Sequence, residues 1–353
     1  MIRINELKLP LDEDEQELYR LAAKALKIGE RHIRELTICK KSVDCRKKDD
    51  IKFIFSVDVA LDIDEKRVAS KAGNRVSLSE KSVYTLPPVK RKSTLRPVIV
   101  GFGPAGMFAA LTLTEAGLSP IIIERGETVD ERTASVKSFW RTRVLNPESN
   151  VQFGEGGAGT FSDGKLTTGI KDKRCRRVFE KFCEHGAPSE IMYSATPHIG
   201  TDRLAGVVKA IRKTVEGCGG EFMFNTKLCD LIIYNGHIQG ITVCHKDGSK
   251  EDIETDTVIL SIGHSARDTL EMLRLKGIDM MQKPFSVGVR IEHRQEMINK
   301  TQYGKFASHP KLNAANYKLA CHPQGGRGAY TFCMCPGGTV VCASSEEGGV
   351  VVN

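Results

Sequence analysis

The chain has 353 residues, of which 40% are hydrophobic and 27% charged, and its formal net charge is +8. The length exceeds one ordinary domain, and the composition is typical of a globular protein with a sizeable core rather than of a low-complexity chain. No apolar run is long enough to cross a membrane. The opening residues lack the basic-then-apolar layout of a signal peptide, so we predict a cytoplasmic protein with reduced cysteines.

Residues 1–88 are predicted to form an α+β domain. Apolar residues from Leu18 to Ile28 recur at helical spacing, Phe53–Leu61 alternates as a half-buried strand, and Ile33–Val43 is the predicted hairpin partner. Polar, proline-marked residues 89–97 form the predicted linker.

The basic excess lies in this first part of the chain. Residues 1–96 hold 22 Lys and Arg against 16 Asp and Glu, which is +6 of the total +8. Acidic residues interrupt the basic loop, and no aromatic residues are interleaved with it, which favours a solvated hairpin loop over a nucleic-acid site. The loop residues in question are Lys40, Lys41, Arg46, Lys47 and Lys48.

From Val98 the pattern changes to alternating strands and helices, which predicts an α/β fold with a doubly wound, Rossmann-like parallel sheet. The predicted elements are strand Val98–Val100, helix Pro104–Glu115, strand Ile121–Ile123, a helix starting at Thr201, an antiparallel insertion at 221–254 and a buried strand Thr257–Ser261. This domain would span 98–275. Residues 276–353 are predicted to be a β-rich region on the substrate side, incomplete in this chain.

The strongest signal is a glycine motif, Gly101-Phe102-Gly103-Pro104-Ala105-Gly106, between a strand and a helix. Gly101 would allow the tight turn, Gly103 the approach of a pyrophosphate, and Gly106 close packing of the helix on the strand. The helix N-terminus would bind the phosphates, together with the backbone at Pro104 and Ala105. Glu124, 18 residues after Gly106, would accept hydrogen bonds from a ribose and repel a 2′-phosphate, which disfavours NADP.

A second glycine-rich segment, 154–165, stands where an NAD-binding domain would continue with another βαβ unit. Its backbone amides could form an anion-binding concavity, with hydroxyl donors from Thr160 and Ser162. We therefore expect a ligand longer than one mononucleotide, which favours FAD. No second glycine motif follows an apolar strand as the first one does, so a nicotinamide reductant, NAD(P)H, would bind only transiently.

No side chain stands out as a general acid or base. Weak catalytic candidates are Arg267 after the strand Thr257–Ser261, Arg290 on an alternating segment with Glu292, and the close pair Cys333 and Cys335. Each has an ordinary alternative: a solvated residue at a helix start, an exposed ion pair, and buried strand cysteines. We expect no metal site, because Cys321, His322 and Cys342 lack a recognised ligand spacing.

The stretches RPVIVGFGPAGMFAAL, SNVQFGEGGAGTFSDGKL, KPFSVGVRIEH and YTFCMCPGG resemble a bacterial and plastid family of FAD-dependent dehydrogenases. The resemblance covers almost the whole chain, and KKSVDCRKKDD resembles the family's N-terminal domain. It implies FAD contacts at Gly101, Gly103, Gly106, Glu124, Arg125, Gly157, Gly159 and Thr160. In FAD domains of the glutathione-reductase type, a glycine in the position of Gly263 also turns beside the cofactor. Family members continue beyond the position of Asn353, so we expect an incomplete chain that retains flavin weakly.

These observations predict an FAD-dependent oxidoreductase that acts on an unidentified small organic substrate by flavin hydride transfer. The alternatives are an NAD-dependent dehydrogenase and a non-catalytic protein that binds flavin or nucleic acid. The sequence leaves the substrate, the electron donor or acceptor and the oligomeric state open.

Overall fold

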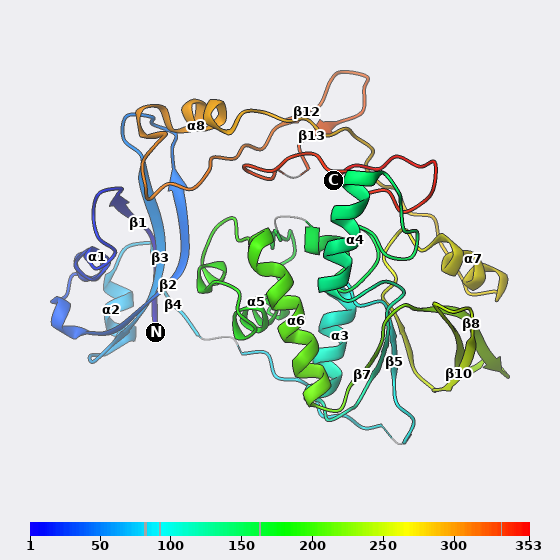
Figure 1. The fold of residues 1–353 in the computed structure, drawn as a ribbon. Helices are drawn as coiled ribbons and strands as arrows, with labels where there is room; N and C mark the ends of the chain where they lie inside the picture. The colour runs from blue at the N-terminus through cyan, green and yellow to red at the C-terminus, as the bar shows by residue number, and fades with distance from the viewer. Residues whose placement is uncertain (81–82, 92, 162–163, 333) are drawn as a thin grey trace.

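A computed structural model describes residues 1–80, 83–91, 93–161, 164–332 and 334–353 (Figure 1). In this part of the chain the strands form four sheets, with the orders β2-β3-β1-β4, β11-β5-β6-β7, β10-β9-β8 and β12-β13. Over the same residues, no helix combines the length and the apolar character needed to cross a membrane.

The N-terminal sheet is antiparallel and confirms the predicted hairpin, because β2 pairs with β3 along most of its length. Every second residue of β3 is buried, and α1 covers this apolar side with Leu18, Ala22, Ala23 and Leu26. Helix α1 ends where Lys27 adopts a left-handed conformation. The elements are β1 (Ile2–Pro10), α1 (Glu17–Leu26), β2 (Ile33–Asp44), β3 (Lys52–Leu61), α2 (Glu65–Lys71) and β4 (Val76–Leu78).

The second sheet is parallel throughout and confirms the Rossmann-like α/β fold. Its strands are β5 (Val98–Val100), β6 (Ile121–Ile123), β7 (Glu221–Met223) and β11 (Val258–Leu260), and its helices are α3 (Pro104–Glu115), α4 (Val129–Thr142), α5 (Arg174–Glu184) and α6 (Thr201–Gly217). Ile99 and Ile122 share a buried cluster with α3, α5 and α6. The alternate residues, Val98, Val100 and Ile123, pack on the opposite face.

An antiparallel sheet covers that opposite face, so the domain has three layers (Figure 1). It consists of β8 (Thr226–Tyr234), β9 (His237–His245) and β10 (Lys250–Glu254). Residues 221–223 were expected to open this antiparallel excursion. They form β7 instead, which pairs in parallel with β6, so the antiparallel part begins at Thr226.

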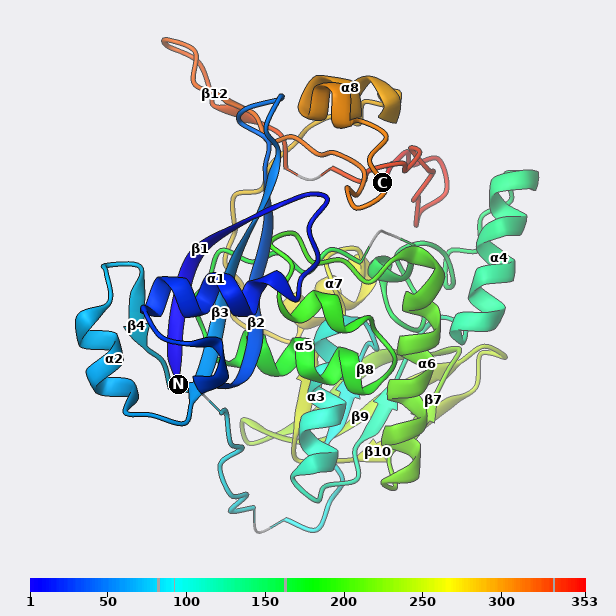
Figure 2. The ribbon, with the colours of Figure 1, turned by 90° about the vertical axis from the view of Figure 1, so that its left-hand side faces the viewer.

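The last part of the chain returns to the N-terminal sheet. It contains α7 (Arg267–Leu275), α8 (Gln295–Tyr303), β12 (Ala320–Cys321) and β13 (Ala329–Tyr330). Ile298 and Tyr303 of α8 belong to the same buried cluster as the N-terminal sheet, and Figure 2 shows α8 near the tip of the β2–β3 hairpin. The alternating stretch 287–291 does not pair as a strand, and Val287, Val289 and Ile291 are 71–92% exposed. Alternation alone does not form a strand where no neighbouring strand supplies the hydrogen bonds.

Candidate functional site

A cavity of about 560 Å³ lies at the carboxyl ends of β5, β6 and β11. Ligands of doubly wound sheets bind at this edge, where loops leave the strands. Most of the residues expected to hold a cofactor line this cavity. These are Gly101, Gly103, Pro104, Ala105, Glu124, Arg125, Gly157, Gly159 and Gly263.

The first glycine turn is built by close backbone contacts. Gly101 has φ +93°, and a Cβ there would lie 2.5 Å from the carbonyl oxygen of Ser261 on the neighbouring strand's extension. Gly106 is not part of the cavity wall; a Cβ at Gly106 would lie 1.9 Å from the carbonyl oxygen of Gly101. Gly106 therefore has the packing role that the sequence predicts, since it lets α3 approach β5.

Helix α3 points its N-terminus at the cavity. Gly103 is the N-cap residue without a side-chain cap, and Pro104 opens the helix. The amides of Ala105 and Gly106 donate to no protein acceptor in the described part of the chain. Unpaired first-turn amides and the helix dipole favour an anion at this position.

The carboxylate of Glu124 joins the two glycine segments. Its Oε2 accepts a hydrogen bond from the amide of Phe102 at 2.8 Å. Its Oε1 accepts from the amides of Gly126 at 2.9 Å and Gly154 at 3.0 Å. Only 4% of Glu124 is exposed, and the residue lines the cavity. A carboxylate has about four lone-pair sites, so one remains for a hydroxyl donor.

The second glycine segment packs directly against the first. The amide of Gly156 donates to the carbonyl of Phe102 at 2.8 Å. Gly157 has φ +64°, and a Cβ there would lie 3.0 Å from the Cα of Gly103. The two segments thus form one continuous backbone wall of the cavity, which supports the prediction that both belong to a single site.

Two buried charged residues hold the second segment in place, and the sequence reasoning missed the role of both. Arg132 of α4 is 0% exposed and donates to the carbonyls of Asn150, Val151 and Glu155 at 2.7–2.8 Å. Glu155, also 0% exposed, accepts from the amide of Val129 at 2.7 Å and from Nε of Arg212 at 2.8 Å. Arg132 lies in an otherwise polar helix of ordinary appearance, so no local pattern distinguished it.

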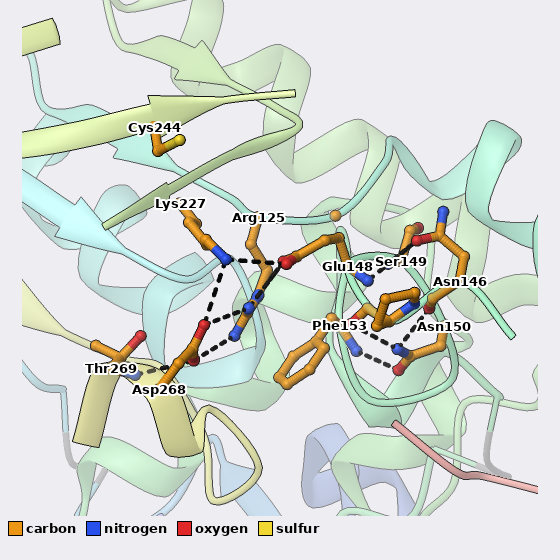
Figure 3. A network of polar contacts seen from close by, with 12 residues as sticks. Arg125, Asn146, Glu148, Ser149, Asn150, Phe153, Lys227, Cys244, Asp268 and Thr269 are labelled. Carbon is orange, nitrogen blue, oxygen red and sulfur yellow. Dashed lines mark hydrogen bonds and ion pairs between the residues drawn. The ribbon is translucent and has the colours of Figure 1, made fainter. Parts of the chain in front are cut away.

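A neutral quartet of charged side chains, Arg125, Lys227, Glu148 and Asp268, forms a network of ion pairs (Figure 3). Arg125 and Lys227 of this quartet line the cavity. The guanidinium of Arg125 contacts Glu148 at 2.8 Å and Asp268 at 2.8 Å. Lys227 contacts the same two carboxylates at 3.0 and 3.5 Å. Arg125 also lies over the ring of Phe153, 4.3 Å from its centroid. Because each cation is matched by a carboxylate, this end of the cavity suits a neutral group such as a nucleoside better than a further phosphate.

Acid is expected to weaken this quartet. Burial raises the pKa values of Glu148 and Asp268, but the hydrogen bonds and positive charges of Arg125 and Lys227 outweigh it, so both pKa values lie below the ordinary range. The stability that the carboxylates contribute is therefore present above the pKa of the unfolded chain, about 4, and is lost as pH falls through the folded-state values. The difference in thermal unfolding between wild type and Arg125→Met should be largest at pH 7 and should shrink progressively as pH falls below about 4. A difference independent of pH would contradict this.

The structure brings the remaining predicted residues to other places. Thr160 is buried, and its hydroxyl donates to the carbonyl of Glu155 at 3.3 Å, away from the cavity wall. Arg267 is 78% exposed at its side chain and pairs with Glu346 at 2.8 Å. Helix α7 starts after Ala266 without a side-chain cap.

Arg290 and Cys335 also lie outside the cavity wall. Arg290 donates to Oδ1 of Asn353 at 3.0 Å. Cys335 is exposed and accepts a hydrogen bond from Nζ of Lys165 at 3.0 Å, and Cys333 and Ser162 lie outside the described residues. Within the described part of the chain, no three His, Cys, Asp or Glu side chains come together as metal ligands.

Comparisons with known proteins match both ends of the chain. Residues 284–353 match a family described as FAD-dependent protein, C-terminal domain-like, and residues 1–60 match a domain of unknown function. A relative from Clostridium beijerinckii, described as an uncharacterized protein, is 49% identical over 355 residues, which are 100% of this chain and 66% of the relative. The digeranylgeranylglycerophospholipid reductase of Methanothrix thermoacetophila is 27% identical over 197 residues, 54% of this chain and 44% of that protein.

Among solved structures, THI4 of Thermovibrio ammonificans is similar with 16% identity and a TM-score of 0.36, over 52% of this chain and 64% of that one. The chain thus spans less than two thirds of the curated relatives that it matches. The predicted resemblance to FAD-dependent proteins is confirmed by the family match, which begins within the stretch KPFSVGVRIEH.

Proposed function

We propose that this chain, similar to FAD-dependent proteins over its last 70 residues and to a reductase over about half its length, is the FAD-binding part of a flavin-dependent oxidoreductase. We further propose a small organic substrate and, because every described cysteine is a free thiol, the cytoplasm as its compartment.

The residues on the cavity wall fit the chemical groups of FAD. The first-turn amides of α3 suit a diphosphate, and the remaining acceptor site of Glu124 suits one ribose hydroxyl. The neutral quartet around Arg125 suits the uncharged adenine end. A cavity of about 560 Å³ is also in the range of cofactor sites.

When bound, the flavin ring supplies the redox chemistry. The chain's own residues bind and orient: α3 and Gly103 would hold the diphosphate, and the second glycine segment would line the adjoining part of the ligand. On the cavity wall, Nδ1 of His264 shares a hydrogen bond of 2.9 Å with the hydroxyl of Ser265.

The observation that carries the proposal is the contact between the two glycine segments, with a Cβ at Gly157 only 3.0 Å from Gly103. A single mononucleotide half would need only the first segment, whereas a long dinucleotide would run along both.

Purified protein should therefore be yellow, or become so on addition of FAD, and bound flavin should survive gel filtration. The same titration with NAD⁺ and NADH distinguishes the first alternative, since an NAD-dependent dehydrogenase would bind these and exclude FAD. A salt-dependent shift of RNA by the full chain, with no flavin retained, would favour the nucleic-acid alternative.

A further inference from the structure

Arg132 is a buried cation with an unusual set of partners. Its side chain is fully buried, yet in the part of the chain that the structure describes no carboxylate lies within ion-pair distance of its guanidinium. Buried charges usually require a direct counter-charge. Burial lowers the pKa of Arg132 to about 10, with opposing effects from Glu124 and Glu155, so the group stays protonated at neutral pH.

The partners of this cation are almost all backbone carbonyls of one segment. Nε donates to Asn150 and Nη2 to Val151, both at 2.8 Å. Nη1 donates to Glu155 at 2.7 Å and to Gly154 at 3.3 Å. One planar guanidinium therefore donates hydrogen bonds to four carbonyl oxygens of a loop that forms part of the cavity wall. Among the side chains, only arginine has the forked set of donors that this geometry needs.

The orientation of these carbonyls determines where the amides point. A carbonyl and the following amide share one planar peptide unit and point in opposite directions. With the carbonyls of Gly154 and Glu155 turned to Arg132, the amides of Glu155 and Gly156 face away from it. They donate to the carbonyls of Glu127 at 3.1 Å and Phe102 at 2.8 Å, and so join the segment to the first glycine turn.

The position of Gly154 shows how closely the segment depends on this side chain. Gly154 has φ +120°, and a Cβ there would lie 2.4 Å from Cδ of Arg132. Gly154 also lines the cavity and donates its amide to Glu124. The stem of Arg132 thus packs directly behind the wall, and its charge lies one residue layer from the ligand space.

We propose that Arg132 is a positioning residue for the ligand: it sets the backbone of 154–157 in the conformation that forms the cavity wall and places a permanent positive charge behind it for an anionic dinucleotide. The second part of this inference rests on the proposed function, whereas the first concerns the ligand-free chain.

The experiment uses the full chain and three variants, Arg132→Met, Arg132→Lys and, as the matched control, Arg141→Met. Arg141 lies on the same helix and is exposed. Amide hydrogen exchange of residues 154–159 is measured without ligand, and FAD affinity is measured by fluorescence titration of the folded fraction. Arg132→Met should exchange faster in this segment and bind FAD roughly 10- to 100-fold more weakly, as for partners that orient a binding group from behind.

Arg132→Lys keeps the charge but cannot reach all four carbonyls, so it should show fast exchange with intermediate affinity. It also serves if Arg132→Met fails to fold. Wild-type exchange and affinity in both Arg132→Lys and Arg132→Met would overturn the inference. A lower melting temperature with unchanged FAD affinity would also overturn it, as would an equal loss of FAD affinity in Arg141→Met. If wild type binds no FAD while exchange in 154–159 still rises in the Arg132 variants, the proposed function fails and the positioning role stands.

Discussion

Gly103→Val is expected to remove FAD binding while leaving the fold intact. Gly103 has φ −77° and ψ −172°, an extended conformation that any residue adopts. A Cβ at this position would lie 3.7 Å from the Cα of Gly157, an ordinary contact. The branched methyl groups of valine would instead occupy the space where a diphosphate must approach the helix N-terminus. We expect the affinity for FAD to fall about 100-fold or more, because most of the phosphate contacts of the site would be lost.

The matched control is Gly206→Val on α6. No atom lies within 4 Å of a Cβ there, and the residue is not on the cavity wall. FAD titration followed by visible absorbance, with far-UV circular dichroism on the same samples, separates binding from folding. Flavin retained by Gly103→Val after dialysis, or lost equally by Gly206→Val, would refute the assignment of the first glycine turn.

Gly106→Ala is expected to have the opposite profile, with a large loss of stability. The added Cβ would lie 1.9 Å from the carbonyl oxygen of Gly101 and 3.5 Å from Cγ2 of Ile99. The obstacle is backbone and cannot rotate away, so α3 would have to move off β5. Overpacking at the upper end of the usual range lowers the free energy of unfolding by about 3 kcal/mol or more. This corresponds to a fall in Tm on the order of 10 °C.

Gly206→Ala provides a control for which the opposite change in stability is expected. It makes the same chemical change inside a helix with space for the methyl group, where alanine is favoured over glycine by about 1 kcal/mol. Urea unfolding should thus show a lower midpoint for Gly106→Ala and an unchanged or higher midpoint for Gly206→Ala. Equal midpoints for wild type and Gly106→Ala would show that α3 does not pack on β5 as described.

Short-range patterns in the sequence predicted the local elements well. The alternation in Phe53–Leu61, the helical spacing after Thr201 and the glycine motif each depend on residues within one turn or one strand, where backbone geometry follows directly from residue type. For the same reason, the sequence predicted that Gly101, Gly103 and Glu124 would lie together, because one βαβ unit brings its two strand ends side by side.

Contacts between segments that are distant in the sequence do not follow from such short-range patterns. Residues 221–223 have the composition of any short strand, and only the packing of α6 brings them to β6 rather than to β8. The stretch 287–291 has a strand's alternation and remains unpaired. The family resemblance implied an FAD contact at Arg125, but it did not indicate the carboxylate partners of Arg125, which come from positions 23 and 143 residues away.

The sequence by itself determined the fold class, the glycine turn and the acid that follows it, because these are set by conformational freedom and periodicity within a few tens of residues. Only the tertiary structure decided which side chains support that turn. A buried arginine such as Arg132 carries no periodic signal, and its role exists only where folding gathers the carbonyls of a loop about 20 residues away around its guanidinium.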